Sequence, residues 1–185
     1  MKFFRFFIII FISLTTSIKA DLNKNLINQL KDGGKLIFIR HAYAPGNGDP
    51  NNFNLKDCST QRNLNSIGQK QAKDIGGFFR GNKIKIYKVL SSEWCRCKET
   101  AKIAFSDFST NNFLNSFYSS QHAKNKKKQL KALNDYIKKF KSNKNLVLVT
   151  HYVLISEVLN YAPSSGEIVV SDINFNIVGT IEIDY

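Results

Sequence analysis

The chain has 185 residues, a mass of 21.1 kDa and a formal net charge of +13. This length suits one domain and excludes a (β/α)₈ barrel or two full domains. Hydrophobic residues make up 43% of the chain, which excludes a disordered protein, and three cysteines are too few for a disulfide scaffold.

Lysine supplies most of the positive charge, since 22 of the 27 basic residues are Lys and five are Arg. The lysines are spread along a chain that is also rich in Asn, which indicates a general compositional bias. We therefore predict no nucleic-acid partner. The few arginines are more informative, because the planar guanidinium group binds an anion through two hydrogen bonds at once.

The first residues have the composition of a secretory signal peptide. Two basic residues are followed by an apolar run over residues 6–14, and Ala20 offers a small residue for cleavage. The apolar run is shorter than the ~20 residues that span a bilayer, although an uncleaved N-terminal anchor remains the alternative. We predict a signal peptide over 1–20, one domain over 21–185 and a periplasmic or secreted location, where disulfides can form.

Short apolar runs alternate with segments of helical spacing along the rest of the chain. Helices are predicted over residues 22–32, 66–79, 91–103, 130–140 and 151–160. Strands are predicted over residues 35–39, 84–90 and 146–150, with a closing pair over 167–171 and 177–183. This alternation predicts an α/β fold, a three-layer αβα sandwich with a mostly parallel central sheet.

Polar side chains follow three of the predicted strands. Arg40 and His41 end the first, His151 follows the third, and Arg96 lies one turn into the helix after the second. The carboxyl ends of parallel strands meet at one edge of the sheet, which is where ligands bind. A neutral imidazole is a nucleophile toward phosphorus, and guanidinium groups stabilise a phosphoryl group during transfer. The pattern therefore predicts phosphoryl transfer through a histidine.

Two other polar residues have simpler interpretations. His122 lies in a polar, Lys-rich segment and is predicted to be exposed to solvent. Arg80 lies near a helix end and is predicted to interact with the helix dipole. The two histidines at the sheet edge lie on separate strands without the spacing of metal ligands, and carboxylates are scarce around them. We therefore predict no metal and no cofactor.

The sequence resembles the histidine phosphatase superfamily, in its phosphoglycerate mutase-like branch 1. The resemblance covers the chain from Leu36 to Ile155 and rests on four motifs that occur in the family's order. They are the strand-Arg-His motif, the L-T-x-x-G-x-x-Q-A helix start, the S-S-x-x-x-R-x-x-x-T-A element and the second histidine, here Leu36–Ala42, Asn63–Ala72, Ser91–Ala101 and Val149–His151. The implied fold is phosphoglycerate mutase-like.

The resemblance also implies roles for the residues at the sheet edge. His41 would be the nucleophile that becomes phosphohistidine, and Arg40, Arg96 and His151 would bind the phosphoryl oxygens. Water would then hydrolyse the phosphohistidine without a cofactor or a metal. This implies an exported phosphatase that acts on small phosphomonoesters. The alternative is a catalytically weak or inactive member of the same fold that binds phosphate at the cell envelope.

The chain departs from the family pattern around the substrate. Arg62 would line the entrance, and Asn47, in the loop after the nucleophile, is a further candidate for substrate binding. Tyr152 stands where many members have Gly and would narrow the pocket or contact the substrate.

Many members of the family also carry a Glu that protonates the leaving group, but residues 107–122 contain no Glu. Glu93, beside Arg96, and Asp49, in the loop after the nucleophile, are the candidates to replace it. A general acid contributes typically 10²–10⁴-fold to a rate, so its absence would favour substrates with good leaving groups.

The three cysteines lie close to these motifs, since Cys58 follows the active-site loop and Cys95 and Cys97 flank Arg96. If Arg96 faces the pocket, the flanking side chains point about 100° to either side, and only one can reach Cys58. The prediction is a disulfide from Cys58 to Cys95 or to Cys97, and three buried thiols are the alternative.

The Lys-rich run over residues 124–128 opens a predicted helix. A solvated helix face is the simplest interpretation. A weak contact with an anionic envelope surface is the alternative, because lipid phosphates attract clustered lysines.

Overall fold

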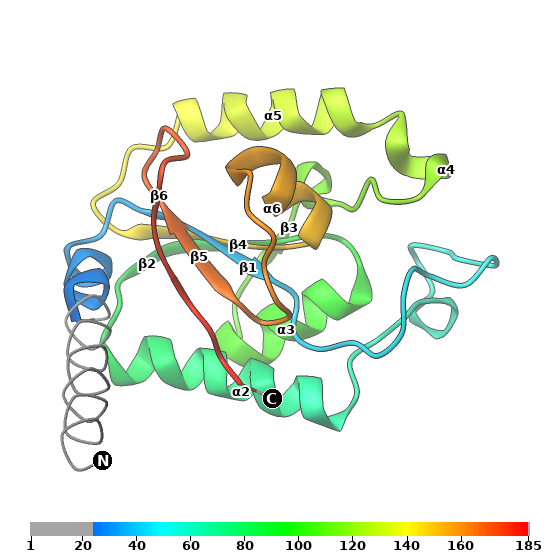
Figure 1. The fold of residues 1–185 in the computed structure, drawn as a ribbon, viewed down its shortest axis with the longest axis horizontal. Coiled ribbons are helices and arrows are strands. Elements are labelled where there is room, and N and C mark those ends of the chain that lie inside the picture. Colours follow the sequence, from blue (N-terminus) through cyan, green and yellow to red (C-terminus); the bar gives the residue numbers. More distant parts are fainter. Residues whose placement is uncertain (1–23, 185) are drawn as a thin grey trace, which may run out of the picture.

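The computed structural model describes residues 24–184, so the predicted signal peptide lies outside the described residues. A six-stranded sheet forms the middle layer, in the order β3-β2-β4-β1-β5-β6 (Figure 1). Its strands are β1 (Leu36–Arg40), β2 (Ile86–Ser91), β3 (Ser109–Thr110), β4 (Asn145–Thr150), β5 (Ile168–Ser171) and β6 (Ile177–Ile181). Strands β3, β2, β4 and β1 pair in parallel, whereas β5 is antiparallel to both β1 and β6.

Helices cover both faces of this sheet. Figure 1 shows α2 and α3 below it and α5 and α6 above it. The bounds are α2 (Ser66–Gly81), α3 (Cys95–Phe105), α4 (Ser120–Ala123), α5 (Lys126–Lys138) and α6 (Tyr152–Leu159), with 3₁₀ turns η1 (Cys58–Thr60) and η2 (Asn112–Leu114). A further helix is described over residues 24–32. The predicted three-layer sandwich with a mostly parallel sheet is confirmed. No helix within residues 24–184 is long and apolar enough to cross a membrane.

Alternate residues of the central strands bury their side chains in two different cores. In β1, Ile37 and Ile39 pack with the helices below the sheet, whereas Leu36 and Phe38 pack with those above it. Both faces of the central strands are therefore apolar, which explains why they read as continuous hydrophobic runs.

The chain stays extended beyond the predicted end of the second strand. The prediction placed a helix start at Ser91, but α3 begins at Cys95. The reason is that Ser91 still pairs with β4, and the backbone N–H of Ser92 donates to the carbonyl of Val149 at 2.9 Å. These ladder bonds hold Arg96 in the first turn of the helix, where it faces the edge of the sheet.

Helix α2 packs tightly against the loop that follows β1. Asn65 caps this helix, because its side chain accepts from the backbone N–H of Gly68 at 3.0 Å. A Cβ atom on Gly68 would lie 1.9 Å from the carbonyl oxygen of Tyr43. Glycine is therefore required for α2 to support the backbone beside His41.

Candidate functional site

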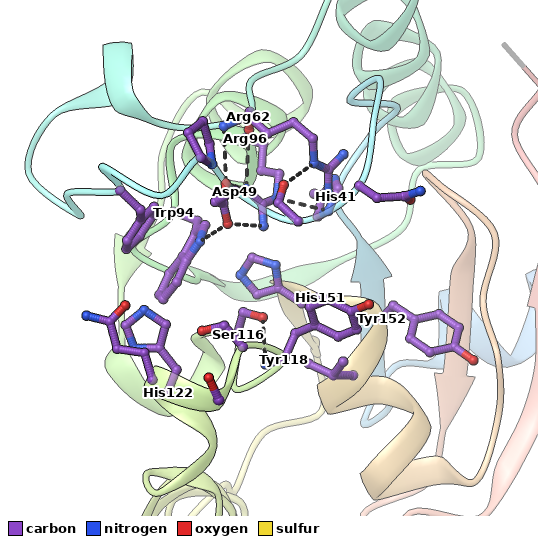
Figure 2. A pocket seen from close by; sticks show the side chains of 18 of the residues that line it. His41, Asp49, Arg62, Trp94, Arg96, Ser116, Tyr118, His122, His151 and Tyr152 are labelled. Atoms are coloured by element: carbon purple, nitrogen blue, oxygen red, sulfur yellow. Dashed lines mark hydrogen bonds and ion pairs between the residues drawn. The ribbon is translucent and has the colours of Figure 1, made fainter.

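A cavity of about 460 Å³ opens at the carboxyl ends of the parallel strands. His41, Arg96 and His151 line it together, as the order of the motifs predicted (Figure 2). The backbone N–H of His41 donates to the carbonyl of Thr150 at 2.9 Å, so the ends of β1 and β4 are joined directly behind the cavity. We call this part of the cavity, around these three side chains, the phosphoryl end.

The imidazole of His41 is fixed in one tautomer by its neighbours. Its Nδ1 lies 2.8 Å from the carbonyl oxygen of Ala42, which can only accept, so Nδ1 carries the proton. Nε2 then accepts from Nε–H of Arg96 at 3.2 Å. Burial and the positive charge of Arg96 hold the pKa of His41 well below its usual value. The ring is therefore neutral, with the Nε2 lone pair directed to the guanidinium of Arg96.

Arg96 is 4% exposed and connects His41 to the active-site loop. Two of its guanidinium nitrogens donate to the carboxylate of Asp49, at 2.6 Å and 3.2 Å. In Figure 2, the ion pair of Asp49 with Arg96 lies between the side chains of His41 and Trp94. Because these nitrogens face the cavity, an incoming oxyanion would compete with Asp49 for the same donors.

Asp49 is the only carboxylate among the described residues that line this cavity. Besides the Arg96 contacts, it accepts from the indole N–H of Trp94 at 3.0 Å and from the backbone N–H of Arg62 at 3.1 Å. Partial burial raises its pKa, but the hydrogen bonds and charge of Arg96 outweigh burial and hold the pKa below the usual value. Asp49 is therefore ionised while it is paired with Arg96.

His151 stands opposite His41, with the two ring centroids 5.6 Å apart at an angle of 69°. Its Nε2 lies 2.8 Å from Oγ of Ser92, whose hydroxyl donates to Asn115. A hydroxyl has one proton, so Nε2 of His151 is the donor in this contact. Burial, followed by the charge of Arg96, lowers its pKa well below the usual value. The site therefore holds two neutral imidazoles.

The remaining predicted arginines line the cavity in different ways. Nη1 of Arg40 donates to the carbonyl of Pro163 at 2.9 Å, and its guanidinium carbon lies 5.6 Å from the ring centre of Tyr152. Arg62 donates to the carbonyls of Gly48 and Ala44, so it holds the active-site loop in place. In this structure Arg62 is thus a positioning residue for the loop.

Two of the other predicted site residues line the cavity, and one does not. Asn47 and Tyr152 line the cavity, as predicted. Glu93 is not among the lining residues that the structure describes. Its carboxylate instead accepts from the side-chain amide of Asn115 at 2.6 Å. Of the two predicted replacements for the general acid, only Asp49 therefore faces the cavity.

The aromatic side chains that surround the outer part of the cavity were not predicted from the sequence. Phe53, Trp94, Tyr118 and His122 line it together with Tyr152. The prediction that His122 is exposed is wrong, because the residue is half-buried. Its ring packs edge-on against Trp94 and Phe53, with ring centroids 5.4 Å and 5.6 Å apart. No short motif marks these residues; the aromatic content of the two loops was the only signal.

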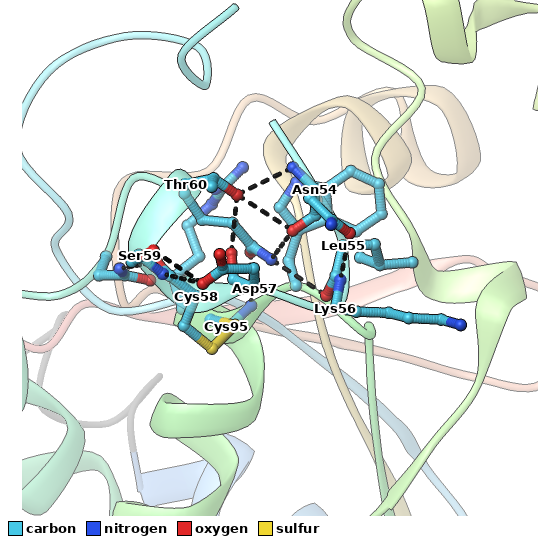
Figure 3. The surroundings of a disulfide bond; sticks show 12 residues. Asn54, Leu55, Lys56, Asp57, Cys58, Ser59, Thr60 and Cys95 are labelled. Atoms are coloured by element: carbon cyan, nitrogen blue, oxygen red, sulfur yellow. Dashed lines mark hydrogen bonds between the residues drawn. A yellow bond between two sulfur atoms is a disulfide. The ribbon is translucent and has the colours of Figure 1, made fainter. Parts of the chain in front are cut away.

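A disulfide joins the active-site loop to α3 (Figure 3). It links Cys58 to Cys95, whereas Cys97 is a buried thiol whose pKa burial raises to about 12. Gln61 adds a second link, since its side-chain carbonyl accepts from the backbone N–H of Cys95 at 2.9 Å. Of the two pairings predicted, the structure has the one with Cys95. Cys97 instead packs against His151, with its Sγ 3.5 Å from Nε2 of that residue.

The described residues contain no group of three or more His, Cys, Asp or Glu side chains that could hold a metal ion.

No protein-family model and no curated protein matches this sequence. Solved structures match its fold. A structure titled as the protein histidine phosphatase SixA complexed with tungstate is 15% identical, with a TM-score of 0.53, and the match covers 77% of this chain and 92% of that one. Phosphoglycerate mutase from Thermus thermophilus is 16% identical with a TM-score of 0.53, over 81% and 99% of the two chains.

A third match is a phosphoserine phosphatase mutant from Entamoeba histolytica in complex with phosphoserine. It is 19% identical with a TM-score of 0.52, over 74% of this chain and 89% of that one. These structures share the α/β architecture described above. The chain therefore has a phosphoglycerate mutase-like fold.

Proposed function

We propose that this protein is a phosphatase that hydrolyses small phosphomonoesters through a phosphohistidine on His41. The observation that carries the proposal is the neutral imidazole of His41, whose unprotonated Nε2 faces the Arg96 guanidinium inside a cavity. Solved structures of the same fold give further support, because one holds the oxyanion tungstate and another holds phosphoserine.

The reaction proceeds in two displacements at phosphorus. Nε2 of His41 attacks the phosphorus atom, the N–P bond forms and the bond to the alcohol oxygen breaks. Water then attacks the phosphohistidine, which releases inorganic phosphate and restores the imidazole. Arg96 neutralises the charge of the phosphoryl oxygens in both steps, and we place Arg40 beside it in this role. His151 is neutral, so we assign it a hydrogen bond to a phosphoryl oxygen, for which its Nε2–H must turn away from Oγ of Ser92.

Asp49 is our candidate for the acid that protonates the leaving alcohol. While Asp49 is paired with Arg96 it is ionised and cannot donate a proton. A phosphoryl group that takes over the Arg96 nitrogens removes that stabilisation and places a second anion nearby, and both changes raise the pKa of a carboxyl group. The substrate would thereby convert Asp49 into an acid.

The test is a comparison of wild-type protein with His41→Ala on p-nitrophenyl phosphate. Loss of the nucleophile should lower kcat by at least about 10⁴-fold. Wild-type protein quenched during turnover of ³²P-labelled substrate should carry a label that acid removes and base does not, and the variant should carry none. Unchanged turnover by His41→Ala would disprove the phosphohistidine route.

A phosphate-binding module without turnover is the second candidate. Asp49 is the sole carboxylate on the described cavity wall, and in this structure it is ionised and paired with Arg96. No carboxylic acid therefore stands ready to protonate a leaving group, which favours this second candidate. Vanadate that binds with no turnover of any phosphomonoester in a broad panel would select this alternative.

Export is also part of the proposal. The signal-like residues 1–20 and the Cys58–Cys95 disulfide support it, because disulfides persist mainly outside the cytoplasm. Fractionation of cells that produce the full chain tests it: we expect a shortened protein outside the cytoplasmic fraction. A full-length cytoplasmic protein would contradict it.

The weak contact with an anionic envelope surface remains a lesser part of the proposal. On α5, Lys126 pairs with Glu157 at 2.7 Å and Lys131 with Asp135 at 2.6 Å, so part of the charge is already balanced within the protein. Binding to anionic vesicles should be weak and should vanish as salt is raised.

A further inference from the structure

The cavity extends well beyond the space that a phosphoryl group needs. Its volume of about 460 Å³ lies within the usual ~300–1,000 Å³ of small-molecule sites. His41 and Arg96 line only the inner part, and Figure 2 shows Trp94 and His122 on the side away from His41. The rest of a phosphomonoester, the alcohol that leaves, must occupy this outer part.

Aromatic rings form the wall of the outer part. The indole of Trp94 is 3% exposed and stacks on Phe53, with ring centroids 5.1 Å apart at 22°. Its centroid also lies 5.3 Å from that of His151 and 5.4 Å from that of His122. The same wall therefore runs without a break from the phosphoryl end to the outer end.

Two tyrosines that line the same cavity keep much of their surface open. The side chain of Tyr118 is 71% exposed and that of Tyr152 is 42% exposed. Aromatic rings gain from stacking or edge contacts with another ring in addition to the burial of apolar area. These two rings can make such contacts with a ligand in the cavity.

The charges on the cavity wall narrow the class of ligand further. Asp49, the only carboxylate on the described wall, is already held by Arg96 and Trp94, whereas three arginines line the cavity. Asp49 is paired with Arg96 in the free site and, in the proposed mechanism, takes up a proton once a phosphoryl group displaces it. In neither state does it offer a free anion to the ammonium group of a leaving alcohol, which would also meet the positive charge of the arginines. A neutral or anionic leaving group fits this wall.

We infer that the aromatic side chains of the cavity wall, with Phe53, Trp94, Tyr118 and His122 at the outer end and Tyr152 on the opposite side, bind a planar aromatic ring carried by the leaving alcohol. The preferred substrates are then monophosphates of alcohols that bear an aryl or heteroaryl ring. This inference rests on the proposed phosphatase function, because it assigns the substrate class of the same site.

The test compares phenethyl phosphate with cyclohexylethyl phosphate. Both alcohols have the same chain and almost the same acidity, so the two esters differ in the planarity and π-electrons of the ring and not in leaving-group chemistry. We expect kcat/KM to be roughly two- to tenfold higher for the phenethyl ester. Phosphocholine and phosphoserine, whose leaving groups are cationic or zwitterionic, should be poorer substrates than both.

Variants of the wall provide the second arm. Tyr118→Leu and Tyr152→Leu should each lower the ratio of the two kcat/KM values toward one. Tyr87→Leu is the matched control, because Tyr87 is 55% exposed and is not among the described lining residues. It should leave the ratio unchanged. A wild-type ratio near one, a ratio unaffected by both wall variants, or a preference for phosphocholine would overturn the inference.

A binding experiment separates this inference from the proposed function. Trp94 is the only tryptophan in the chain, so its fluorescence reports on the cavity wall. We expect phenethylphosphonate, which cannot be hydrolysed, to bind roughly two- to tenfold more tightly than cyclohexylethylphosphonate. Turnover of phosphomonoesters together with equal affinities for the two phosphonates would leave the phosphatase proposal standing and overturn the aromatic site. Tighter binding of phenethylphosphonate without any turnover would support the aromatic site and overturn the phosphatase proposal.

Discussion

His41 and His151 come directly after the neighbouring strands β1 and β4. Phe53 instead reaches the same cavity from a loop, and His122 reaches it from the short helix α4. The phosphoryl end is buried, and sheet-edge hydrogen bonds fix its backbone. The outer end depends on a loop that Arg62 and the Cys58–Cys95 disulfide hold in place.

This contrast separates two tasks that the proposed phosphatase must perform. Transfer of a phosphoryl group needs donors at fixed positions, and strand ends within a packed sheet supply them. Recognition of the leaving group differs from one substrate to the next, and loops can change for this purpose without disturbing the core. The two ends of the cavity should therefore respond differently to mutation.

Arg96→Ala should have the largest effect, because it removes the donors that face the transferred group. An arginine that stabilises phosphoryl transfer contributes about 10³–10⁵-fold. We expect kcat/KM for p-nitrophenyl phosphate to fall by at least about 10³-fold, which steady-state kinetics would measure. Arg80→Ala is the control, since Arg80 is exposed and donates to the carbonyl of Ala104 on α3, away from the cavity.

Since Arg96 is buried, its variant must first be shown to fold. A far-UV circular dichroism spectrum like that of the wild type would establish this, and Arg96→Lys would keep the charge in a folded protein. A loss of less than about tenfold in a folded Arg96→Ala protein would contradict the assignment of this residue to the transferred phosphoryl group.

The disulfide should stabilise the whole protein while acting mainly on the outer end. It closes a loop of 37 residues, for which the chain-entropy model gives about 3–4 kcal/mol. We expect Cys58→Ser/Cys95→Ser to lower the free energy of unfolding in urea by about this amount. A dithiol reductant should destabilise the wild type equally and leave the double variant unchanged. Equal stability with and without the reductant would show that the bond contributes nothing.

The phosphoryl end could be predicted from the sequence because its signals are local. Apolar strands that end in His41 and His151, with Arg96 at a helix start, place three polar groups at one sheet edge on the rules of α/β topology alone. The same rules yielded the three-layer fold. Strand and helix ends shifted by a few residues where ladder bonds, as at Ser92, held the chain extended.

The outer end could not be predicted because its contacts join segments that are distant in the sequence. Asp49 meets Arg96 across 47 positions, and the rings of Phe53 and His122 meet only after the loop that holds Phe53 and the segment that holds α4 have folded. The composition around His122 suggested exposure, and only tertiary packing against Trp94 overrides it. The choice of Cys95 over Cys97 likewise depended on the path of the loop.

Acid should destabilise the protein through the phosphoryl end. Burial holds the pKa values of His41 and His151 well below 6.5, so below about pH 6.5 the unfolded chain binds protons that the folded protein does not. Stability is therefore complete above this pH and falls as the pH drops toward the folded-state values. Two such groups give a slope of up to about 2.7 kcal/mol per pH unit.

Urea unfolding measured between pH 7 and pH 5 would check this slope. His41→Asn should remove about half of it, because one of the two titrating groups is gone. A wild-type stability that does not change over this range would contradict the description of two buried neutral imidazoles.

The effect of Asp49→Asn on oxyanion binding should be the smallest of these effects, and its sign is the most informative, because Asp49 belongs to both ends of the cavity. The carboxylate occupies the Arg96 nitrogens that an oxyanion needs, so an uncharged amide should let vanadate bind more tightly, on the order of tenfold. Asp57→Asn, an exposed residue of the same loop whose carboxylate accepts from Ser59, should leave vanadate affinity unchanged. Inhibition constants for vanadate against p-nitrophenyl phosphate would measure both.

If Asp49 is also the acid, the same variant should turn over alkyl phosphates more slowly while sparing the aryl ester, whose leaving group needs no proton. Weaker vanadate binding by Asp49→Asn would instead mean that the carboxylate orients Arg96 for the oxyanion, and the loop would then belong to the catalytic machinery rather than compete with the substrate.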